Sequence, residues 1–303
     1  MYRDLLRWVA PTPEVDEPPE YLEKQVEWFR CLPFVAIHLA ALSVFLLPFS
    51  WFCVLLAMGS YLIRMFAITA FYHRYFSHRT FETSRIFQFL GAFVACAAGQ
   101  RGPLWWAAHH RRHHRHSDTD EDLHSPHSQS FLQSHVFWFM TEYALPTAMK
   151  EIPDLRKFPE LRFLNRFDWI PVLVLAGAAY LLGETAWAQN SFSATGLQCL
   201  AWGFLLPTVA LYHATFCVNS ITHIFGKRRF PTKDHSRNNL LVSIITLGEG
   251  WHNNHHFFPG SARQGFRKRE FDPTYYVLKL LAHLRIVRNL RPVPDWVLAK
   301  AQS

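Results

Sequence analysis

Two histidine-rich segments with the same spacing, HRRHH (110–114) and HNNHH (252–256), occur in this 303-residue chain. In each segment the histidines stand at positions i, i+3 and i+4, which share one face of a helix, so we expect three imidazoles to converge. Imidazole nitrogen binds iron, zinc and copper, so the ligand type predicts a metal without choosing among these three. The six histidines are His110, His113, His114, His252, His255 and His256.

Three further histidines are candidate ligands. His73 and His78 belong to the segment HRYFSH, and His223 belongs to NSITHIFG. His73 and His78 are five residues apart, or about 140° around an α-helix, so they should not face one metal from a continuous helix. Either the helix breaks near Tyr75, or the two side chains serve two metals. Nine candidate ligands favour two metal ions.

Long apolar segments separate these histidines. The chain is 50% hydrophobic and yet carries a net charge of +8, which is unusual for a soluble enzyme. Four apolar runs are long enough for a helix to cross a bilayer core of about 30 Å. They are residues 34–50, 52–71, 169–188 and 197–218. The second run contains Arg64, which we expect to pair with a polar group inside the bundle because a lone charge at that depth is costly.

The basic residues predict the orientation of these four runs. Four Lys or Arg precede the first run, twelve lie between the second and third, and fourteen follow the fourth. The presumed outer turns, at Trp51 and at residues 189–196, contain none. Because Lys and Arg in short loops remain cytoplasmic, we expect both termini and the middle segment on the cytoplasmic side, with all the histidine clusters.

Other segments complete the predicted topology. The run 86–100 is too short to cross, so we expect it to be an interfacial or re-entrant helix, and the aromatic stretch 131–149 to lie along the membrane surface. His38 and His213 fall inside predicted spans, where we expect them to bond to a neighbouring helix. Five cysteines with no CxxC spacing are expected to be small buried hydrophobic residues rather than disulfides.

The histidine boxes occur in a longer sequence pattern that resembles the membrane-bound fatty acyl desaturases, nearest to bacterial relatives of the stearoyl-CoA (Δ9) desaturases. The similar stretches include ITAFYHRYFSHRTFET, GPLWWAAHHRRHHRHSDTDEDLHSP, NSITHIFG, GEGWHNNHHFFP and FDPTYYVLKLL. The resemblance implies an all-α integral membrane protein, with four transmembrane helices and a cytoplasmic helical cap that holds a histidine-rich di-iron site. The chain would be one domain, 1–303, whose cap comprises residues 72–168 and 219–303.

The resemblance also implies the ligands and the cofactor, two iron ions (Fe2+/Fe3+). The nine ligands would be His73, His78, His110, His113, His114, His223, His252, His255 and His256. Asn219, four residues before His223 and so on the same helical face, matches a position that reaches the metal through water. Ligating histidines usually donate their second N–H to a carboxylate or carbonyl, for which Glu249, Asp118 and Asp122 are candidates.

The implied reaction is the oxygen-dependent introduction of a cis double bond, at Δ9, into a long saturated acyl chain. Removal of hydrogen from adjacent methylenes offers no acidic proton, so a metal centre must supply the reactivity while the protein fixes which carbons approach it. A substrate tunnel is therefore expected beside the second span. Its candidate lining residues, taken at helical spacing back from His73 with one aromatic residue added, are Thr69, Met65, Tyr61, Ala57 and Trp106. Tyr61 would lie near the closed end and limit chain length.

Basic residues near the boxes are candidates for the substrate headgroup, namely Arg101, Arg267 and Lys268. Acyl-CoA is the first expectation for the substrate, and acyl chains on a membrane phospholipid remain an alternative. The electrons must come from an external carrier, since the bundle and cap use almost the whole chain. The basic cytoplasmic face favours a small acidic protein, a ferredoxin, rubredoxin or b-type cytochrome with its reductase. Dioxygen and membrane lipid are the other expected partners, nucleic acid is not one, and a bacterial inner membrane is the expected location.

Three other functions fit parts of the sequence. A related di-iron enzyme could hydroxylate a lipid, although the asparagine–tyrosine-rich box of the membrane alkane hydroxylases is absent. A histidine-rich metal transporter would place its ligands at bilayer depth, whereas these clusters lie outside the spans. An inactive lipid-binding relative would need a loss that the three intact boxes do not show.

Overall fold

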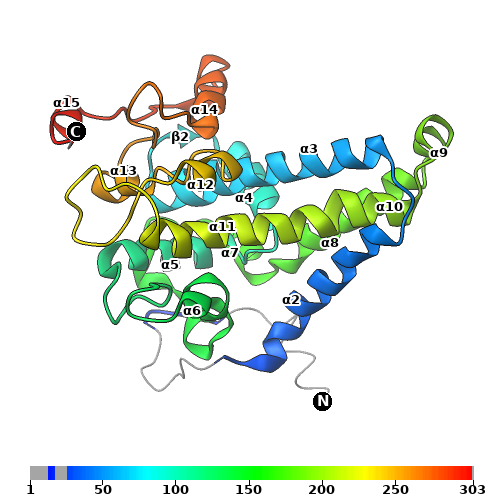
Figure 1. Ribbon diagram of the computed structural model, residues 1–303, viewed down its shortest axis with the longest axis horizontal. Helices are drawn as coiled ribbons and strands as arrows, with labels where there is room; N and C mark the ends of the chain where they lie inside the picture. Colours follow the sequence, from blue (N-terminus) through cyan, green and yellow to red (C-terminus); the bar gives the residue numbers. More distant parts are fainter. Residues whose placement is uncertain (1–12, 18–25, 302–303) are drawn as a thin grey trace.

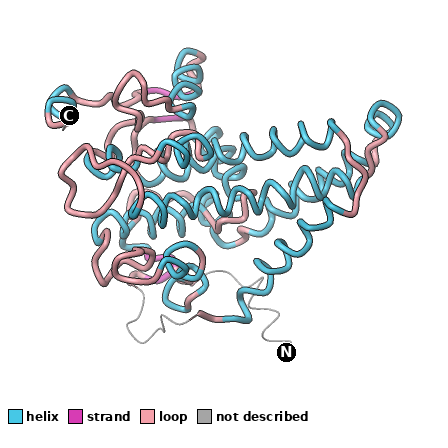
Figure 2. The backbone as a smooth tube through the Cα atoms, in the orientation of Figure 1, coloured by secondary structure: helices cyan, strands magenta, loops and turns pink. Residues whose placement is uncertain are grey.

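The structure is a computed structural model that describes residues 13–17 and 26–301. Helices dominate it, and the strands are short and lie near one end (Figure 2). Predictions that concern residues 1–12 and 18–25, including the side of the membrane on which the N-terminus lies, fall outside the described part.

The apolar bundle is built from helices that run from the histidine-rich end toward the opposite end of the molecule (Figure 1). It contains α2 (Trp28–Ala41), α3 (Trp51–Ala67), α8 (Trp169–Gly183), α10 (Gly196–Leu200) and α11 (Leu206–Ile224). A short 3-10 turn, Leu42–Phe45, follows α2, and the π-helical segment η6 (Ala201–Leu205) joins α10 to α11. At the far end, α10 begins with a capping box, in which Thr195 accepts from the backbone of Gln198 and the Gln198 side chain accepts from the backbone of Thr195.

Two helices of the bundle are long and apolar enough to cross a membrane, Trp51–Ser77 and Gly196–Ile224. A third crossing is possible if α7 (Pro159–Arg166) and α8, which meet at 72°, count as one broken span. The first apolar segment, Cys31–Phe45, is shorter. The described residues thus contain two or three candidate spans, and the predicted fourth remains a prediction.

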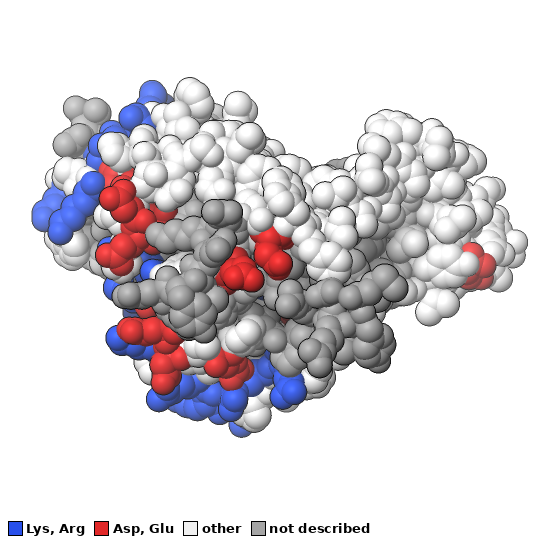
Figure 3. All heavy atoms as spheres, turned by 90° about the horizontal axis from the view of Figure 1, so that it is seen from below, with Lys and Arg blue, Asp and Glu red and all other residues white. Residues whose placement is uncertain are grey.

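Charge is distributed along the molecule as a membrane protein requires. Seen from below, Lys, Arg, Asp and Glu gather at the histidine-rich end, while the opposite end is almost entirely without charge (Figure 3). Large apolar side chains are exposed along the bundle, including Phe45 at 82% and Leu46 at 87%. Apolar surface exposed on this scale is consistent with a lipid environment.

The remaining helices and strands form the histidine-rich end. The helices are α4 (Arg85–Cys96), α5 (Pro103–His116), α6 (Phe131–His135), α7, α12 (Leu240–Ile245), α13 (His252–Phe257), α14 (Pro273–His283) and α15 (Asp295–Ala299), while α9 (Ala186–Phe192) lies at the far end. The 3-10 turns are Phe137–Met140, Glu142–Ala144 and Met149–Glu151. The strands are β1 (Glu14–Val15), β2 (Glu82–Thr83), β3 (Thr147–Ala148) and β4 (Val287–Arg288). β1 pairs in parallel with β3 and β2 antiparallel with β4, so each pair joins distant parts of the chain.

The main hydrophobic core surrounds the continuation of α3, the π-helical segment η2 (Ile68–Ser77). All ten residues of η2 are buried, and its side chains pack with those of α4, α5 and α7. Burial of this segment on all sides holds the first histidine box in place, because a packed side chain cannot move without opening a cavity.

Three sequence expectations about polar and cysteine side chains are confirmed. The Arg64 guanidinium donates to Thr208 Oγ1 at 2.6 Å and to the Ser60 carbonyl at 3.2 Å, so the buried charge has polar partners. His38 Nε2 lies 3.1 Å from His213 Nε2, which joins α2 to α11. All five cysteines are free, and four of them are buried.

Candidate metal centre

The structure brings the nine predicted histidines together in two adjoining groups. The potential ligand atoms of each group lie within 4.8 Å of one another. The first centre comprises His73, His78, His110, His114 and His255. The second centre comprises His113, His223, His252 and His256.

His73 and His78 belong to one centre because a π-helix contains His73 and ends directly before His78. The predicted alternatives, a break near Tyr75 or service to two metals, are both wrong: η2 runs unbroken through Tyr75 to Ser77, and both rings face the first centre. A π-helix bonds residue i to residue i+5 and has wider turns than an α-helix, so side chains five apart lie much closer to one face than they do on an α-helix. Their ring centroids are 4.9 Å apart.

Each HxxHH box divides its histidines between the two centres. The expectation that three imidazoles of a box converge is wrong, because on an α-helix position i+4 lies about 40° to one side of i and i+3 about 60° to the other. In α5, His110 and His114 face the first centre and His113 the second. In α13, His252 and His256 face the second centre and His255 the first. The same spacing used twice thus supplies both sites.

Some ring nitrogens lie as close together as two ligands of one metal ion. His78 Nε2 lies 2.8 Å from His110 Nε2, His255 Nε2 lies 2.9 Å from His73 Nε2, and in the second centre His223 Nε2 lies 3.0 Å from His252 Nε2. With metal–nitrogen bonds of about 2.1 Å, ligands at 90° are about 3.0 Å apart, and tetrahedral ligands about 3.4 Å. The first centre also offers five nitrogens, one more than a tetrahedral ion takes.

Hydrogen bonds among the rings do not account for these contacts. His114 Nε2 lies 3.0 Å from His110 Nε2 and 2.8 Å from His255 Nε2. A ring nitrogen has one proton or one lone pair, so it cannot satisfy both neighbours. In the second centre the buried Nε2 of His256 has no hydrogen-bond partner. These converging nitrogens fit a bound cation.

The protonation state of the rings suits metal binding. Burial, followed by the charge of neighbouring histidines, lowers the pKa of His110, His114, His252 and His255 well below the usual value. Burial also lowers the pKa of His256 to about 4, against the opposing effect of Asp234. At neutral pH these rings are therefore neutral, which is the state that ligates a metal.

Three predicted carboxylates contact histidines of the two centres. Glu249 pairs with His73 Nδ1, Asp118 Oδ2 lies 2.8 Å from His223 Nδ1, and Asp122 Oδ2 lies 3.0 Å from His113 Nδ1. Burial raises the pKa of Asp118 and Asp122, but hydrogen bonds and the charge of the facing histidines outweigh it and hold both below the usual range. A carboxylate that accepts Nδ1–H directs Nε2 toward the centre.

The sequence reasoning missed a fourth carboxylate, Asp234. Its Oδ2 lies 2.7 Å from His256 Nδ1, and its Oδ1 accepts from the backbone and hydroxyl of Ser236. Asp234 lies in a loop far from any histidine box, so neither spacing nor helical periodicity connects it to His256. Gln264 was also missed; its Nε2 donates to Glu249 Oε2 at 3.0 Å and so steadies the partner of His73.

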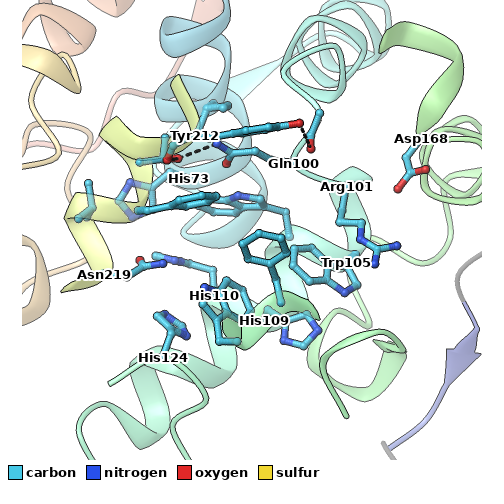
Figure 4. A pocket seen from close by; sticks show the side chains of 18 of the residues that line it. His73, Gln100, Arg101, Trp105, His109, His110, His124, Asp168, Tyr212 and Asn219 are labelled. Carbon is cyan, nitrogen blue, oxygen red and sulfur yellow. Dashed lines mark hydrogen bonds between the residues drawn. The ribbon is translucent and has the colours of Figure 1, made fainter. Parts of the chain in front are cut away.

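A cavity of about 510 Å³ reaches both centres (Figure 4). His73, His110 and His252 line it, as does Asn219, while Arg101 and Asp168 line the side away from Asn219. Apolar and aromatic side chains of α2, α8 and α11 form much of its wall. Such a cavity accommodates an extended apolar molecule beside the histidines.

The predicted tunnel stripe lines this cavity only in part. Thr69 and Trp106 line it, whereas Ala57, Tyr61 and Met65 do not. Tyr61 instead donates its hydroxyl to the Ile245 carbonyl at 2.6 Å. The stripe was extended back from His73 at α-helical spacing, and the wider turns of η2 shift the register, so residues before Ile68 face elsewhere.

Of the three predicted headgroup residues, one lines the cavity and two do not. Arg101 lines the cavity, with its guanidinium 5.8 Å from the Trp105 ring centroid. Arg267 and Lys268 are exposed on the loop before α14 and do not line the cavity.

Comparison with known proteins shows what this chain is similar to. The family model described as fatty acid desaturase matches residues 46–269. The acyl-CoA 5-desaturase AL21 of Anemone leveillei is 34% identical over 96% of this chain and 90% of its own length. The sn-1 stearoyl-lipid 9-desaturase of Anabaena variabilis is 34% identical over 88% of this chain and 94% of its own. The sn-2 palmitoyl-lipid 9-desaturase of Nostoc sp. (strain 36) is 34% identical over 89% and 92%.

Proposed function

Since this chain belongs to the fatty acid desaturase family and is therefore an oxidoreductase, we propose that it introduces a cis double bond at Δ9 into a long saturated acyl chain, using dioxygen. The observation that carries the proposal is the cavity of about 510 Å³ whose wall includes histidines of both centres. An acyl chain in that cavity would have its methylenes beside the two groups of ring nitrogens.

The metal in this proposal is iron, one ion in each centre. The nine histidines would be its ligands, and Asn219, on the cavity wall, would reach the second centre through water. Iron with dioxygen and two electrons supplies the power to remove hydrogen from an unactivated methylene, which no acid or base side chain in the cavity has. Five imidazole nitrogens in the first centre are compatible with iron and exceed the four ligands of tetrahedral zinc.

The protein's own residues determine which carbons react. His73, His110 and His252 fix the position of the centres on the cavity wall. Glu249 orients the ring of His73, and Asp122 and Asp118 orient those of His113 and His223. Aromatic side chains such as Trp106, whose ring stacks on His110 at 4.9 Å, exclude water beside the centres. The length of cavity between Arg101 and the centres would set the double-bond position.

The proposal also concerns the group to which the acyl chain is attached. We favour acyl-CoA, with Arg101 near the headgroup, and keep a phospholipid-bound chain as the alternative. The names of the relatives include both acyl-CoA and acyl-lipid desaturases, so similarity supports an acyl substrate of either kind. Purified protein supplied in turn with stearoyl-CoA and with dipalmitoyl phosphatidylcholine would separate the two.

The membrane arrangement is also proposed. Four spans would place both termini and the cap, residues 72–168 and 219–303, on the cytoplasmic side of a bacterial inner membrane. Two or three candidate spans and the charge at the histidine-rich end support this arrangement. Reporter fusions at the two termini and in the segment 72–168 would test it, since four spans put all three on one side, whereas two or three spans do not.

Two other functions are less well supported. A lipid hydroxylase would use the same centres but leave oxygen in the product, so product analysis separates it from a desaturase. A metal transporter needs a path of ligands through the bilayer, whereas α5 and α13, which carry six of the nine histidines, lie at one end of the molecule (Figure 1).

The test of the proposal is anaerobic purification with iron quantification, together with gas chromatography of membrane lipids from a host that produces wild type or His256→Ala. We expect about two irons per wild-type chain and new cis-monounsaturated chains with wild type alone. Oxygenated products would support the hydroxylase instead. Protein with iron but with unaltered chains, supplied with both acyl carriers and reductant, would contradict the proposal.

A further inference from the structure

We propose that a basic surface around α13 is the docking site of the acidic electron-carrier protein and that the asparagines of HNNHH connect this surface to the two centres. This inference rests on the proposed function, which requires electrons from outside. We call the surface the carrier face. It comprises Lys227, Arg228, Arg229, Arg267, Lys268, Arg269, Trp296 and Lys300.

The carrier face is formed where two basic segments meet, residues 227–229 and 267–269. The buried carboxylate of Glu270 joins them, because it pairs with the Arg229 guanidinium and its Oε2 accepts from the backbone N–H of Arg267 at 3.0 Å. Burial, and then the nearby charge of Arg267, lower the pKa of Arg229, consistent with like charges held together. Like charges are costly to gather, and an acidic partner would relieve that cost.

An exposed aromatic side chain adjoins these charges. Trp296 is 53% exposed, and its ring centroid lies 5.6 Å from that of Phe258 and 6.3 Å from that of Phe257. The Lys300 amine lies 5.4 Å from the Trp296 ring, and Asp295 is the carboxylate beside it. A rigid exposed tryptophan with a charged surround is typical of the centre of a protein–protein interface.

The first connection runs from segment 227–229 to the second centre. Asn253 is fully buried, and its Oδ1 accepts from the backbone N–H groups of Arg229 and Phe230, both at 2.7 Å. Its neighbour in the chain is His252 of the second centre. One hydrogen bond and a few covalent bonds thus separate the surface segment from that ligand.

The second connection runs from segment 267–269 to the first centre. Asn254 is also fully buried, and its Nδ2 donates to Glu270 Oε2 at 2.9 Å and to the Gln264 carbonyl at 2.9 Å. Its neighbour in the chain is His255 of the first centre. Segment 227–229 is thus bonded directly to the residue next to a ligand of the second centre. Segment 267–269 reaches the residue next to a ligand of the first centre through Glu270.

The electrons balance with the proposed reaction. Conversion of two adjacent methylenes to a double bond releases two hydrogen atoms, and reduction of dioxygen to two waters needs four electrons and four protons. The acyl chain supplies two of the four electrons and two of the four protons. Two reduced one-electron carriers supply the other two electrons, and solvent supplies the other two protons. Each carrier leaves oxidised by one electron. Two carrier molecules must therefore bind the carrier face in succession for each double bond formed.

This inference reassigns Arg267 and Lys268, which the sequence suggested for the substrate headgroup. Neither lines the cavity, whereas both lie on the surface that Asn254 and Glu270 join to α13. Binding of substrate phosphates to the carrier face is therefore the competing outcome of the test.

The test compares two double variants with the same change in charge, Lys227→Glu/Arg269→Glu on the carrier face and Arg156→Glu/Lys157→Glu on an exposed segment before α7. Iron-loaded wild type and variants are assayed with a plant-type ferredoxin, a rubredoxin and a soluble b-type cytochrome, each with its reductase, and separately with a photoreduced neutral deazaflavin. We expect Lys227→Glu/Arg269→Glu to lower kcat/KM for the most effective carrier at least tenfold and to flatten its dependence on ionic strength. Deazaflavin-driven turnover and the KM for the acyl substrate should stay within twofold of wild type.

The remaining outcomes are decisive. Equal losses of kcat/KM for the carrier in both double variants would mean that the overall positive charge of the protein attracts the carrier and that no docking face exists. A raised KM for the acyl substrate would assign the face to the headgroup and overturn the proposal, as would wild type that works with deazaflavin but with none of the three acidic carriers. Wild type that makes no unsaturated product with any reductant would instead contradict the proposed function.

A second variant, Asn253→Ser, tests the connection apart from docking. We expect an unaltered KM for the carrier but slower reduction of the iron at saturating carrier in stopped-flow spectroscopy, with iron content as the check on folding. An unaltered reduction rate with full iron content would exclude the route through Asn253.

Discussion

Asp234 Oδ2 lies 2.7 Å from His256 Nδ1, so a loop carboxylate orients a ring on helix α13. Burial raises the pKa of Asp234, but the hydrogen bond and charge of His256 outweigh that effect and hold it below the usual range. The carboxylate is therefore ionised at neutral pH and accepts Nδ1–H, which leaves His256 Nε2 facing the second centre.

Asp234→Asn should weaken metal binding at the second centre, because an amide is a poorer acceptor and can also present its N–H to the ring. Loss of such a partner typically lowers metal affinity about 10–100-fold. Iron titration of the apoprotein measures this. Asp120→Asn, at an exposed position, is the control, and equal affinities in the two variants would show that Asp234 does not orient His256.

Substitution of one ligand in each centre should remove one metal at a time. His78 belongs to the first group and His223 to the second, and the groups share no histidine. We expect His78→Ala and His223→Ala each to lower the metal content from two toward one per chain, and the double variant toward none, by elemental analysis. Exposed His283→Ala should leave the content unaltered. Loss of both metals in either single variant would argue against two separate sites.

Removal of the metals should destabilise the chain, because the lone pairs of buried nitrogens about 3 Å apart then face one another without a cation. A ligand present at 100 times its Kd stabilises the folded state by about 2.7 kcal/mol, so chelation should lower the Tm by several degrees. Fe2+ should restore the Tm more fully than Zn2+, since the first centre offers five nitrogens, one more than tetrahedral Zn2+ takes. Equal recovery with both ions in a thermal melt would contradict that argument.

The sequence predicted which histidines come together but not how they divide. Spacing identified the nine residues of the two groups, because amphipathic periodicity and topology bring helix faces to one side of a bundle. It did not show that His113 and His114 face different centres. Adjacent residues point about 100° apart on an α-helix, but the sequence does not show where the two centres lie around that helix. The π-helix under His73 and His78 was also hidden, because its i to i+5 bonds depend on packing rather than on a residue pattern.

Contacts between segments that are far apart in the sequence could not be predicted. Glu249, Asp118 and Asp122 lie within or close to the histidine motifs, so proximity in the chain suggested them. Asp234 contacts His256 because its loop folds back beside α13. Arg64 contacts Thr208 because α3 packs against α11 where these two residues lie. Such partners depend on three-dimensional packing that one sequence does not reveal.

Tyr61 illustrates how the wider turns of η2 alter an expectation about chain length. Its hydroxyl donates to the Ile245 carbonyl, and it does not line the cavity. Tyr61→Phe should therefore keep the product chain-length profile and lose about 1 kcal/mol of stability with the hydrogen bond. A shifted profile in gas chromatography would place Tyr61 at the closed end after all.

The cavity wall itself should control chain length, and α2 provides a matched pair of positions. Ile37 lines the cavity, whereas Leu39, two residues along, is 64% exposed. Ile37→Trp adds bulk to a filled cavity, and overpacking of this kind costs about 1–3 kcal/mol, equivalent to about a 5- to 150-fold loss in kcat/KM. The loss should be greater for 18-carbon than for 14-carbon chains, because a shorter chain leaves space for the indole. Leu39→Trp, which adds the same ring on the outer face, should alter neither rate. Equal effects of the two substitutions, or a loss independent of chain length, would mean that the acyl chain does not occupy this cavity.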